Sequence, residues 1–506
     1  MNIQINLGIK INRRQFFYLS AIVLGAIILR LVYFPYNIPV SADSLEYFLY
    51  AADIVALGHL PDTWMAINNG WPIFLSFWFS LIPLNEVIEF MTLQRILAVI
   101  FSSITAIPIY FLCKKFVEPE YAAFASILFV FDPRILTNSI LGITEALYIF
   151  LGITSLVLLL KNDRKTVMFS LIIASLCVIV RGEGIFFVFA LAIIFFVRNK
   201  INKKSLSIFL PALVIFFVIL IPIMLHRIEV TGTDGIFLRA TGSALQTAIQ
   251  TQQNNFQNTF LGIEIFVKYL GWVMIPNFIV FVPIGIIHFF KNRTSENKFI
   301  IIFLALMSIP AFYAYTVPVQ DTRYLYFMFP IFCLLSAFAL RKYVSKKRSK
   351  NLLVIIIIIG VVSSSIIFYE FKKDDWRVDN YKEIEYLEIS KEINQIVKST
   401  NYHPILGRYM NAIQVTDNWP IFYEQISFET NLIHIKNSNN LQEFIEENSN
   451  SLTHLVIDKN SNKSAFFDEL FLNEKKYDYL ELVYNSKNNG YEQEFKIFKI
   501  NYDKFS

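Results

Sequence analysis

Residues 205–225 read SLSIFLPALVIFFVILIPIML and contain no charged side chain. About 20 apolar residues are enough for a helix to cross the hydrocarbon core of a bilayer. The rest of the 506-residue chain has a similar character, because 55% of its residues are hydrophobic and 17% are charged. Soluble proteins carry about 25% charged residues. The composition therefore excludes a soluble enzyme, a disordered chain and a small secreted disulfide scaffold.

Outward from this stretch, other apolar runs of similar length follow in both directions. We predict a polytopic α-helical membrane protein with eleven spans, at 16–34, 88–112, 120–138, 140–160, 166–181, 184–198, 205–225, 268–290, 298–317, 324–340 and 351–369. The third and fourth spans meet at Asp132-Pro133-Arg134, so either could be partly re-entrant. The apolar stretch 71–83 is too short to cross comfortably and is predicted to be interfacial or re-entrant.

The distribution of Lys and Arg predicts the orientation. Eleven spans place every basic cluster on one side, and these clusters lie at 10–14, 114–115, 161–165, 198–204, 291–293 and 341–350. By the positive-inside rule that side is the cytoplasm. We therefore expect a multi-pass plasma-membrane protein with a cytoplasmic N-terminus, and most polar residues outside the tail on the extracytoplasmic face.

The tail after residue 369 has a different composition. Residues 370–506 carry 16 Lys and Arg against 23 Asp and Glu, whereas the preceding residues carry 29 against 17. Helical periodicity over 380–399 and strand patterns at 453–458, 479–484 and 495–500 predict a small α/β fold. We expect two domains: a membrane domain over 1–369 and an extracytoplasmic α/β domain over 370–506.

Two carboxylates near the extracytoplasmic ends of predicted spans are candidates for chemistry. Asp43 follows the first span and either caps a helix or accepts a proton from a nucleophile. Glu145 lies inside an apolar segment, where a charge is costly and normally faces a partner or a cavity. It either serves function or pairs with Arg134 or Arg95 to hold the helices together.

Further charged residues gather on the same predicted face. Arginine there either extends to lipid headgroups or binds a phosphate with its planar fork of donors. Several arginines with a carboxylate among them suit a phosphorylated lipid. The residues are Arg95, Arg134, Arg181, Glu183, His226, Arg227, Asp321 and Arg323.

Several other classes of site have no support in the sequence. The three cysteines lie in apolar stretches and are expected to be small buried hydrophobes. We find no His/Cys metal spacing, no nucleotide-binding glycine loop, and a net charge of +5 that is too dispersed for nucleic acid. No cofactor is certain, and a divalent cation stays open because carboxylates either bind one or act without it.

In the order of several short motifs, the chain resembles the membrane glycosyltransferases of the GT-C superfamily. Within that superfamily it is most similar to the branch of the protein O-mannosyltransferases and aminoarabinose transferases. The resemblance covers about residues 1–345. It rests on Asp43 after the first span, NGWP (69–72), PRILTNSILGITEALYIF (133–150), RGEG (181–184) and DTRYLYFMFP (321–330).

The resemblance implies transfer of a hexose or pentose from a polyprenyl- or dolichyl-phosphate donor to a protein, lipid or glycan acceptor, with inversion. Asp43 would be the general base and Glu145 the second acidic group. Arg323, Arg181 and Arg95 would bind the donor phosphate. Candidate substrate contacts are Arg134, Glu183, His226, Arg227, Asp321 and Tyr324.

Some features depart from that family or leave alternatives open. The first loop has Asp43-Ser44 where many protein mannosyltransferases have Asp-Glu, and the WWDYG motif of oligosaccharyltransferases is missing. The polar loop 226–267 is either a substrate lid or a connector. A transporter or flippase, or a non-catalytic receptor or assembly subunit, is the alternative to a transferase, although we detect no repeated halves.

Overall fold

The computed structural model places the chain in two compact units. It describes residues 3–5, 9–84, 86–235, 255–291, 297–316, 321–344, 350–374, 382–398, 402–403, 408–409, 412–413, 440–449, 452–459 and 465–505. We call one unit the helical unit; it comprises Met1–Pro35, Ile67–Trp71 and Gln94–Val378. The other, the mixed unit, comprises Tyr36–Ala66, Pro72–Leu93 and Asp379–Ser506.

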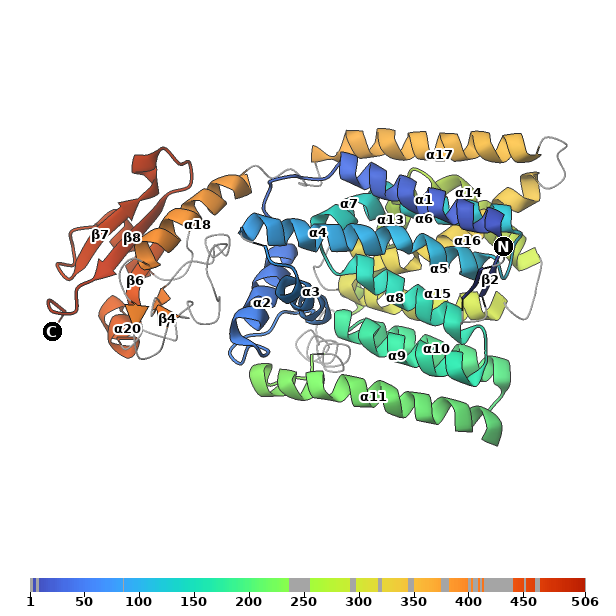
Figure 1. The fold of residues 1–506 in the computed structure, drawn as a ribbon, viewed down its shortest axis with the longest axis horizontal. Coiled ribbons are helices and arrows are strands. Elements are labelled where there is room, and N and C mark those ends of the chain that lie inside the picture. Colours follow the sequence, from blue (N-terminus) through green and yellow to red (C-terminus); the bar gives the residue numbers. More distant parts are fainter. Residues whose placement is uncertain are drawn as a thin grey trace. The chain divides into compact units, whose positions relative to one another are not determined.

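The helical unit is a bundle of long helices that run side by side (Figure 1). Its described elements are a short hairpin of β1 (Ile3–Ile5) and β2 (Ile9–Ile11), followed by α1 (Arg13–Val32), the greater part of α4 (Val87–Ile104), α5 (Ala106–Cys113), α6 (Pro119–Val130), α7 (Pro133–Leu141), α8 (Glu145–Leu159), α9 (Arg164–Val180), α10 (Gly184–Asn199), α11 (Lys203–Thr231), α13 (Asn255–Met274), α14 (Phe278–Lys291), α15 (Asn297–Thr316), the 3₁₀ segment η1 (Thr322–Met328), α16 (Phe329–Val344) and α17 (Lys350–Lys372).

Local sequence signals explain where these helices begin and end. The side chain of Asn202 caps α11 and accepts from the backbone N–H of Ser205, and α11 ends at Gly232 in the left-handed conformation. Asp132 caps α7 through the N–H groups of Arg134 and Ile135, with Pro133 at the first helical position. These caps satisfy backbone groups that the ends of a helix leave unpaired.

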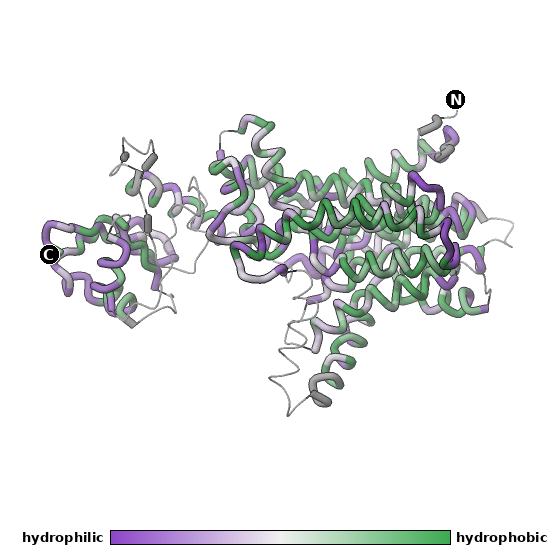
Figure 2. The backbone as a smooth tube through the Cα atoms, turned by 90° about the horizontal axis from the view of Figure 1, so that it is seen from below, coloured by the Kyte–Doolittle hydropathy of each residue, from purple (hydrophilic) through white to green (hydrophobic). Residues whose placement is uncertain are grey.

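Six helices in the described part of the chain are long and apolar enough to cross a membrane, or up to eight if each bent pair is one span. The residues of the bundle are hydrophobic along most of the length of the helices, and hydrophilic residues gather near the helix ends (Figure 2). The protein is therefore a multi-pass membrane protein.

Two predicted spans are not straight helices. The span expected at 120–138 is bent by 53° between α6 and α7, where Asp132 and Pro133 interrupt the helix. The span expected at 268–290 is bent by 107° between α13 and α14. Hydropathy predicts the apolar segments but not their direction, because it does not distinguish a straight helix from a bent pair.

The mixed unit combines helices with strands. Its described elements are α2 (Asp43–Leu57), most of α3 (Gly70–Leu81), α18 (Lys382–Lys398), the short strands β3 (Tyr402–His403), β4 (Arg408–Tyr409) and β5 (Ala412–Ile413), α20 (Leu441–Glu447), β6 (Leu452–Asp458), α21 (Ala465–Leu472), β7 (Leu480–Asn485), η4 (Ser486–Asn489) and β8 (Phe495–Ile500). A four-stranded sheet among these residues has the order β5-β6-β8-β7.

The sheet is parallel between β5 and β6 and antiparallel between β6 and β8 and between β7 and β8. Phe444, Leu455, Phe467 and Phe498 form part of its buried apolar core. The strands expected at 453–458, 479–484 and 495–500 coincide with β6, β7 and β8 to within a residue at each end. Their short runs of β-branched and aromatic residues account for this agreement, since such residues favour strands.

Candidate functional site

The candidate site begins with the turn that leads into α8. Gly142 ends α7 in the left-handed conformation. Its carbonyl oxygen accepts hydrogen bonds from Trp71 Nε1 and from Gln94 Nε2, both at 2.9 Å. These two bonds hold the turn that places Glu145 as the first residue of α8.

Gly70, which precedes Trp71 in the NGWP motif, has a separate structural role. A Cβ atom at this position would lie 2.6 Å from the backbone nitrogen of Val180, at the end of α9. Only glycine allows this close approach of two backbones. The motif therefore supports both the start of α8 and the end of α9, where Arg181 follows.

Glu145 lies between two arginines. Its Oε1 accepts a hydrogen bond from Arg181 and is 3.9 Å from a terminal nitrogen of Arg323. Glu145 is 2% exposed and Arg181 is 9% exposed, so water screens their pairing only weakly. The partner of Glu145 is thus Arg181, not Arg134 or Arg95 as the sequence suggested, because α8 packs against α9.

Two further carboxylates complete the cluster. Arg181 is 3.4 Å from Glu183, and Nε of Arg323 is 2.5 Å from Oδ2 of Asp321. Asp321 also accepts from the backbone N–H of Arg323 at 2.8 Å. Two guanidinium groups therefore stand among three carboxylates, and both arginines are oriented before any ligand binds.

A small cavity of about 20 Å³ lies beside this cluster. Its walls come from α8, the α9–α10 turn, α15 and η1, and its lining residues are Glu145, Tyr148, Ile149, Arg181, Glu183, Met307, Pro310, Arg323, Tyr324 and Phe327. The guanidinium of Arg181 lies 5.9 Å from the ring centre of Tyr148 and 5.8 Å from that of Tyr324. The lining of this cavity combines guanidinium and hydroxyl donors, which are suited to contact an anionic group.

The structure brings five of the predicted site residues into this cavity: Glu145, Arg181, Glu183, Arg323 and Tyr324. Asp321 joins them through Arg323. Sequence reasoning did not select Tyr148 or Phe327 as site residues. The spacing of three residues from Glu145 on one helix is the signal that could have found Tyr148.

Arg134 and Arg95 lie in other surroundings. Arg134 donates to the carbonyl oxygens of Trp272, at 2.7 Å, and Ile275. Its guanidinium also lies 5.1 Å from the ring centre of Phe368. Arg95 donates to the carbonyl of Pro35 at 3.5 Å. Neither lines the cavity beside Glu145.

His226 and Arg227 lie near the end of α11, also away from this cavity. Arg227 donates to Oδ1 of Asn69 at 2.9 Å and to the carbonyl of Ile67 at 3.1 Å. Of the loop 226–267, residues 236–254 lie outside the described residues, so the expected lid stays a prediction.

Asp43 belongs to the mixed unit, where it is the first residue of α2. The N-cap position is occupied by Ala42, which makes no side-chain capping hydrogen bond. Ala42 has φ 50° and ψ −132°, a conformation that residues with a Cβ rarely adopt. Such strain concentrates at functional sites.

The carboxylates of the cavity are not arranged as a metal site. No group of three His, Cys, Asp or Glu side chains that could hold a metal ion occurs within the described ranges. Glu145 and Glu183 both pair with the guanidinium of Arg181, so this group supplies the positive charge that a metal ion would otherwise supply. At this cavity the carboxylate oxygens thus pair with arginines, and a divalent cation stays a prediction that the test below addresses.

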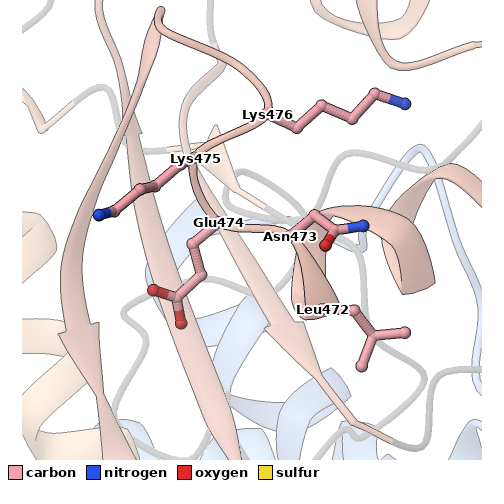
Figure 3. A pocket seen from close by; sticks show the side chains of 5 residues that line it. All are labelled: Leu472, Asn473, Glu474, Lys475 and Lys476. Carbon is pink, nitrogen blue, oxygen red and sulfur yellow. The ribbon is translucent and has the colours of Figure 1, made fainter.

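A second hollow lies at the surface of the mixed unit, in the turn after α21 (Figure 3). It is lined by Leu472, Asn473, Glu474, Lys475 and Lys476. Glu474 pairs with Lys496 at 2.7 Å and Lys476 with Glu469 at 2.5 Å. The side chains of Lys475 and Lys476 point in opposite directions in Figure 3, so they do not converge on a ligand.

Solved structures share the fold of this chain. ArnT from Cupriavidus metallidurans, bound to undecaprenyl phosphate, matches with a TM-score of 0.59 and 9% identity over 96% of this chain and 98% of that chain. The oligosaccharyltransferase of Archaeoglobus fulgidus matches with a TM-score of 0.57 and 12% identity over 88% and 69%. The fold is that of the GT-C membrane glycosyltransferases, as expected from the motifs.

The family follows from a direct match of sequence. The model of the Alg9-like mannosyltransferase family matches residues 69–403, and the chain belongs to this family. A search of curated proteins finds no significant match. The protein is therefore a membrane glycosyltransferase, which decides against the transporter and receptor alternatives.

Proposed function

We propose that this protein transfers a sugar from a polyprenyl- or dolichyl-phosphate donor to a protein, lipid or glycan acceptor on the extracytoplasmic face, with inversion. The observation that carries the proposal is the buried cavity in which Arg181 and Arg323 flank Glu145. The ArnT structure contains undecaprenyl phosphate, and one A. fulgidus AglB structure contains dolichol phosphate with an inhibitory peptide.

Arg181 and Arg323 are proposed to stabilise the charge that develops on the leaving lipid phosphate. Fixed donors in a cavity that excludes water are effective because they need no reorganisation during the reaction. Glu145 keeps Arg181 in position and prevents the two guanidinium groups from repelling each other. Arg95 is less suited to this role, because its guanidinium donates to the carbonyl of Pro35.

Asp43 is proposed to be the general base. Its carboxylate takes the proton of the acceptor hydroxyl or amide while the acceptor heavy atom bonds to the anomeric carbon. The bond from that carbon to the phosphate oxygen breaks, and its electron pair leaves with the lipid phosphate. The strained backbone at Ala42 supports the proposal, since it fixes the direction in which the chain enters α2 at Asp43.

We also propose the finer topology that the sequence predicts. The shorter apolar helices α8 and α10, together with α9 of 17 residues, would complete eleven crossings when counted with the eight in long helices and bent pairs. Residues 1–369 would form the membrane domain with a cytoplasmic N-terminus. Residues 370–506 would form an extracytoplasmic α/β domain, for which the sheet of the mixed unit is the support.

The test is transfer by the purified protein in lipid, with labelled polyprenyl-phosphate sugars. We expect Asp43→Asn and Glu145→Gln to lower turnover at least a hundredfold, because each removes a charge that the proposed reaction uses. Glu46→Gln, which removes a charge one turn further along α2, is the matched control and should retain turnover. Normal turnover by Asp43→Asn would overturn the role of Asp43 as base. The same transfer assay with a metal chelator tests whether the reaction needs a divalent cation.

A further inference from the structure

Tyr148 lines the cavity and is almost completely enclosed. It lies on α8 three residues after Glu145 and is 5% exposed. The cavity that it lines also contains Arg181, Tyr324 and Phe327. Its ring is therefore on the same wall as the acidic residue of the ion cluster.

The hydroxyl group of Tyr148 has no hydrogen-bond partner among the described residues. Nearby tyrosines differ. The hydroxyl of Tyr315 donates to the carbonyl of Asp321 at 2.8 Å, and that of Tyr326 is 3.2 Å from the hydroxyl of Thr322. A buried hydroxyl without a partner destabilises the folded protein, and phenylalanine would fill the same space without this cost. The contacts within the folded chain therefore do not explain why this position carries a hydroxyl group.

Packing prevents Tyr148 from turning its hydroxyl elsewhere. Its ring lies 4.5 Å from the ring of Phe327, which in turn is stacked on Phe303 at 5.7 Å. Gly152, one turn along α8, provides the space for Phe327, because a Cβ there would lie 2.3 Å from the Phe327 ring. The thiol of Cys177 donates to the carbonyl of Tyr148 at 3.6 Å. The hydroxyl is held before a ligand arrives, which lowers the entropy cost of binding one.

We infer that the Tyr148 hydroxyl donates a hydrogen bond to a phosphate oxygen of the lipid-phosphate donor. The inference rests on the proposed function and names a further binding residue for it. The guanidinium of Arg181 lies over the Tyr148 ring, so an anion drawn to Arg181 comes close to the phenol. The cluster already holds two arginines and three carboxylates, and a neutral donor adds a bond to the phosphate without adding another charge.

The test compares Tyr148→Phe with wild type in binding of undecaprenyl phosphate by the full-length protein in lipid nanodiscs. We expect the Kd to rise about tenfold or more, because the lost bond has a charged acceptor. The KM for the sugar-carrying donor should rise by a similar factor. Without ligand, Tyr148→Phe should unfold at the same or a higher temperature than wild type, since it loses an unpaired hydroxyl.

Tyr110→Phe is the matched control. Tyr110 is 1% exposed on α5, its hydroxyl also has no partner among the described residues, and it does not line this cavity. This variant should leave the Kd unchanged.

Three outcomes would overturn the inference. One is an unchanged Kd of Tyr148→Phe while wild type binds undecaprenyl phosphate. Another is an unchanged Kd with a raised KM for the sugar-carrying donor, which would place the hydroxyl on the sugar. If wild type neither binds the lipid phosphate nor transfers sugar, the proposed function itself fails and the inference fails with it.

Discussion

Glu145 shows how one residue can bear on both stability and the proposed chemistry. A carboxylate at the start of a buried apolar helix is costly unless a cation compensates it. Arg181 supplies that cation from the end of α9, and Arg323 lies close enough to contribute. The same pairing orients the arginines toward the cavity, so the free energy of folding and the geometry of the site depend on the same contact.

This dual role can be separated by a double variant. Arg181→Gln should lower stability by about 3–5 kcal/mol, because it leaves Glu145 buried without its main partner. Adding Glu145→Gln should restore most of the thermal stability but not donor binding, since the phosphate still lacks Arg181. Thermal unfolding in detergent and donor binding measure the two effects. A double variant as unstable as Arg181→Gln alone would refute this explanation.

At the scale of the elements, close helix packing determines where the walls of the site lie. α14 and α16 cross at Gly285, where a Cβ atom would lie 2.0 Å from the carbonyl oxygen of Leu335. Small residues at such crossings let membrane helices approach closely. Because α16 follows directly on η1, this crossing also restrains the segment that carries Arg323 and Tyr324.

Gly285→Ala should therefore lower the unfolding temperature, since the two backbones must separate to accept the methyl group. Gly360→Ala on α17 is the control, because a Cβ there meets nothing within 4 Å. That change should keep or raise stability through the better helix propensity of alanine, by up to about 1 kcal/mol. Equal unfolding temperatures for the two variants would show that the crossing tolerates a side chain.

At the scale of the whole molecule, the sequence predicts different parts of the protein to different depths. Apolar runs predict the membrane segments, and short runs of β-branched and aromatic residues predict β6, β7 and β8, because both patterns are local. The bends at Asp132-Pro133 and between α13 and α14 depend on tertiary packing, so hydropathy did not predict their size.

The site was predictable only in part for the same reason. Glu145, Arg181 and Arg323 could be selected because a charge in an apolar segment needs compensation. The partner of Glu145 could not be selected, because Arg181 is 36 residues away and meets it only through the packing of α8 on α9. Tyr148 was missed because an uncharged residue in an apolar helix gives no signal until its hydroxyl is seen to lack a partner.

In the whole molecule, the mixed unit is the part whose stability His454 makes sensitive to pH. His454 on β6 is fully buried, and burial together with Lys499 lowers its pKa to about 4. Folding favours the neutral form of His454. Its contribution to the free energy of unfolding is therefore complete above about pH 6.5 and is lost as the pH falls toward 4. The difference amounts to roughly 3 kcal/mol.

We therefore expect the full-length protein to unfold at a lower temperature as the pH falls from 6.5 to 4, and His454→Gln to reduce this change. Thermal unfolding of both proteins across that range is the measurement. A pH dependence that is the same in the variant would assign the effect to other groups.

The carbonyl of Gly142 has a practical consequence for protein engineering. This carbonyl accepts hydrogen bonds from Trp71 and Gln94. These two residues do not line the cavity, but they hold the turn before Glu145. A library designed to change the sugar that is accepted should leave these two positions constant and vary Met307 and Pro310. Those apolar residues form the wall from α15 and belong to none of the ion pairs of the cluster.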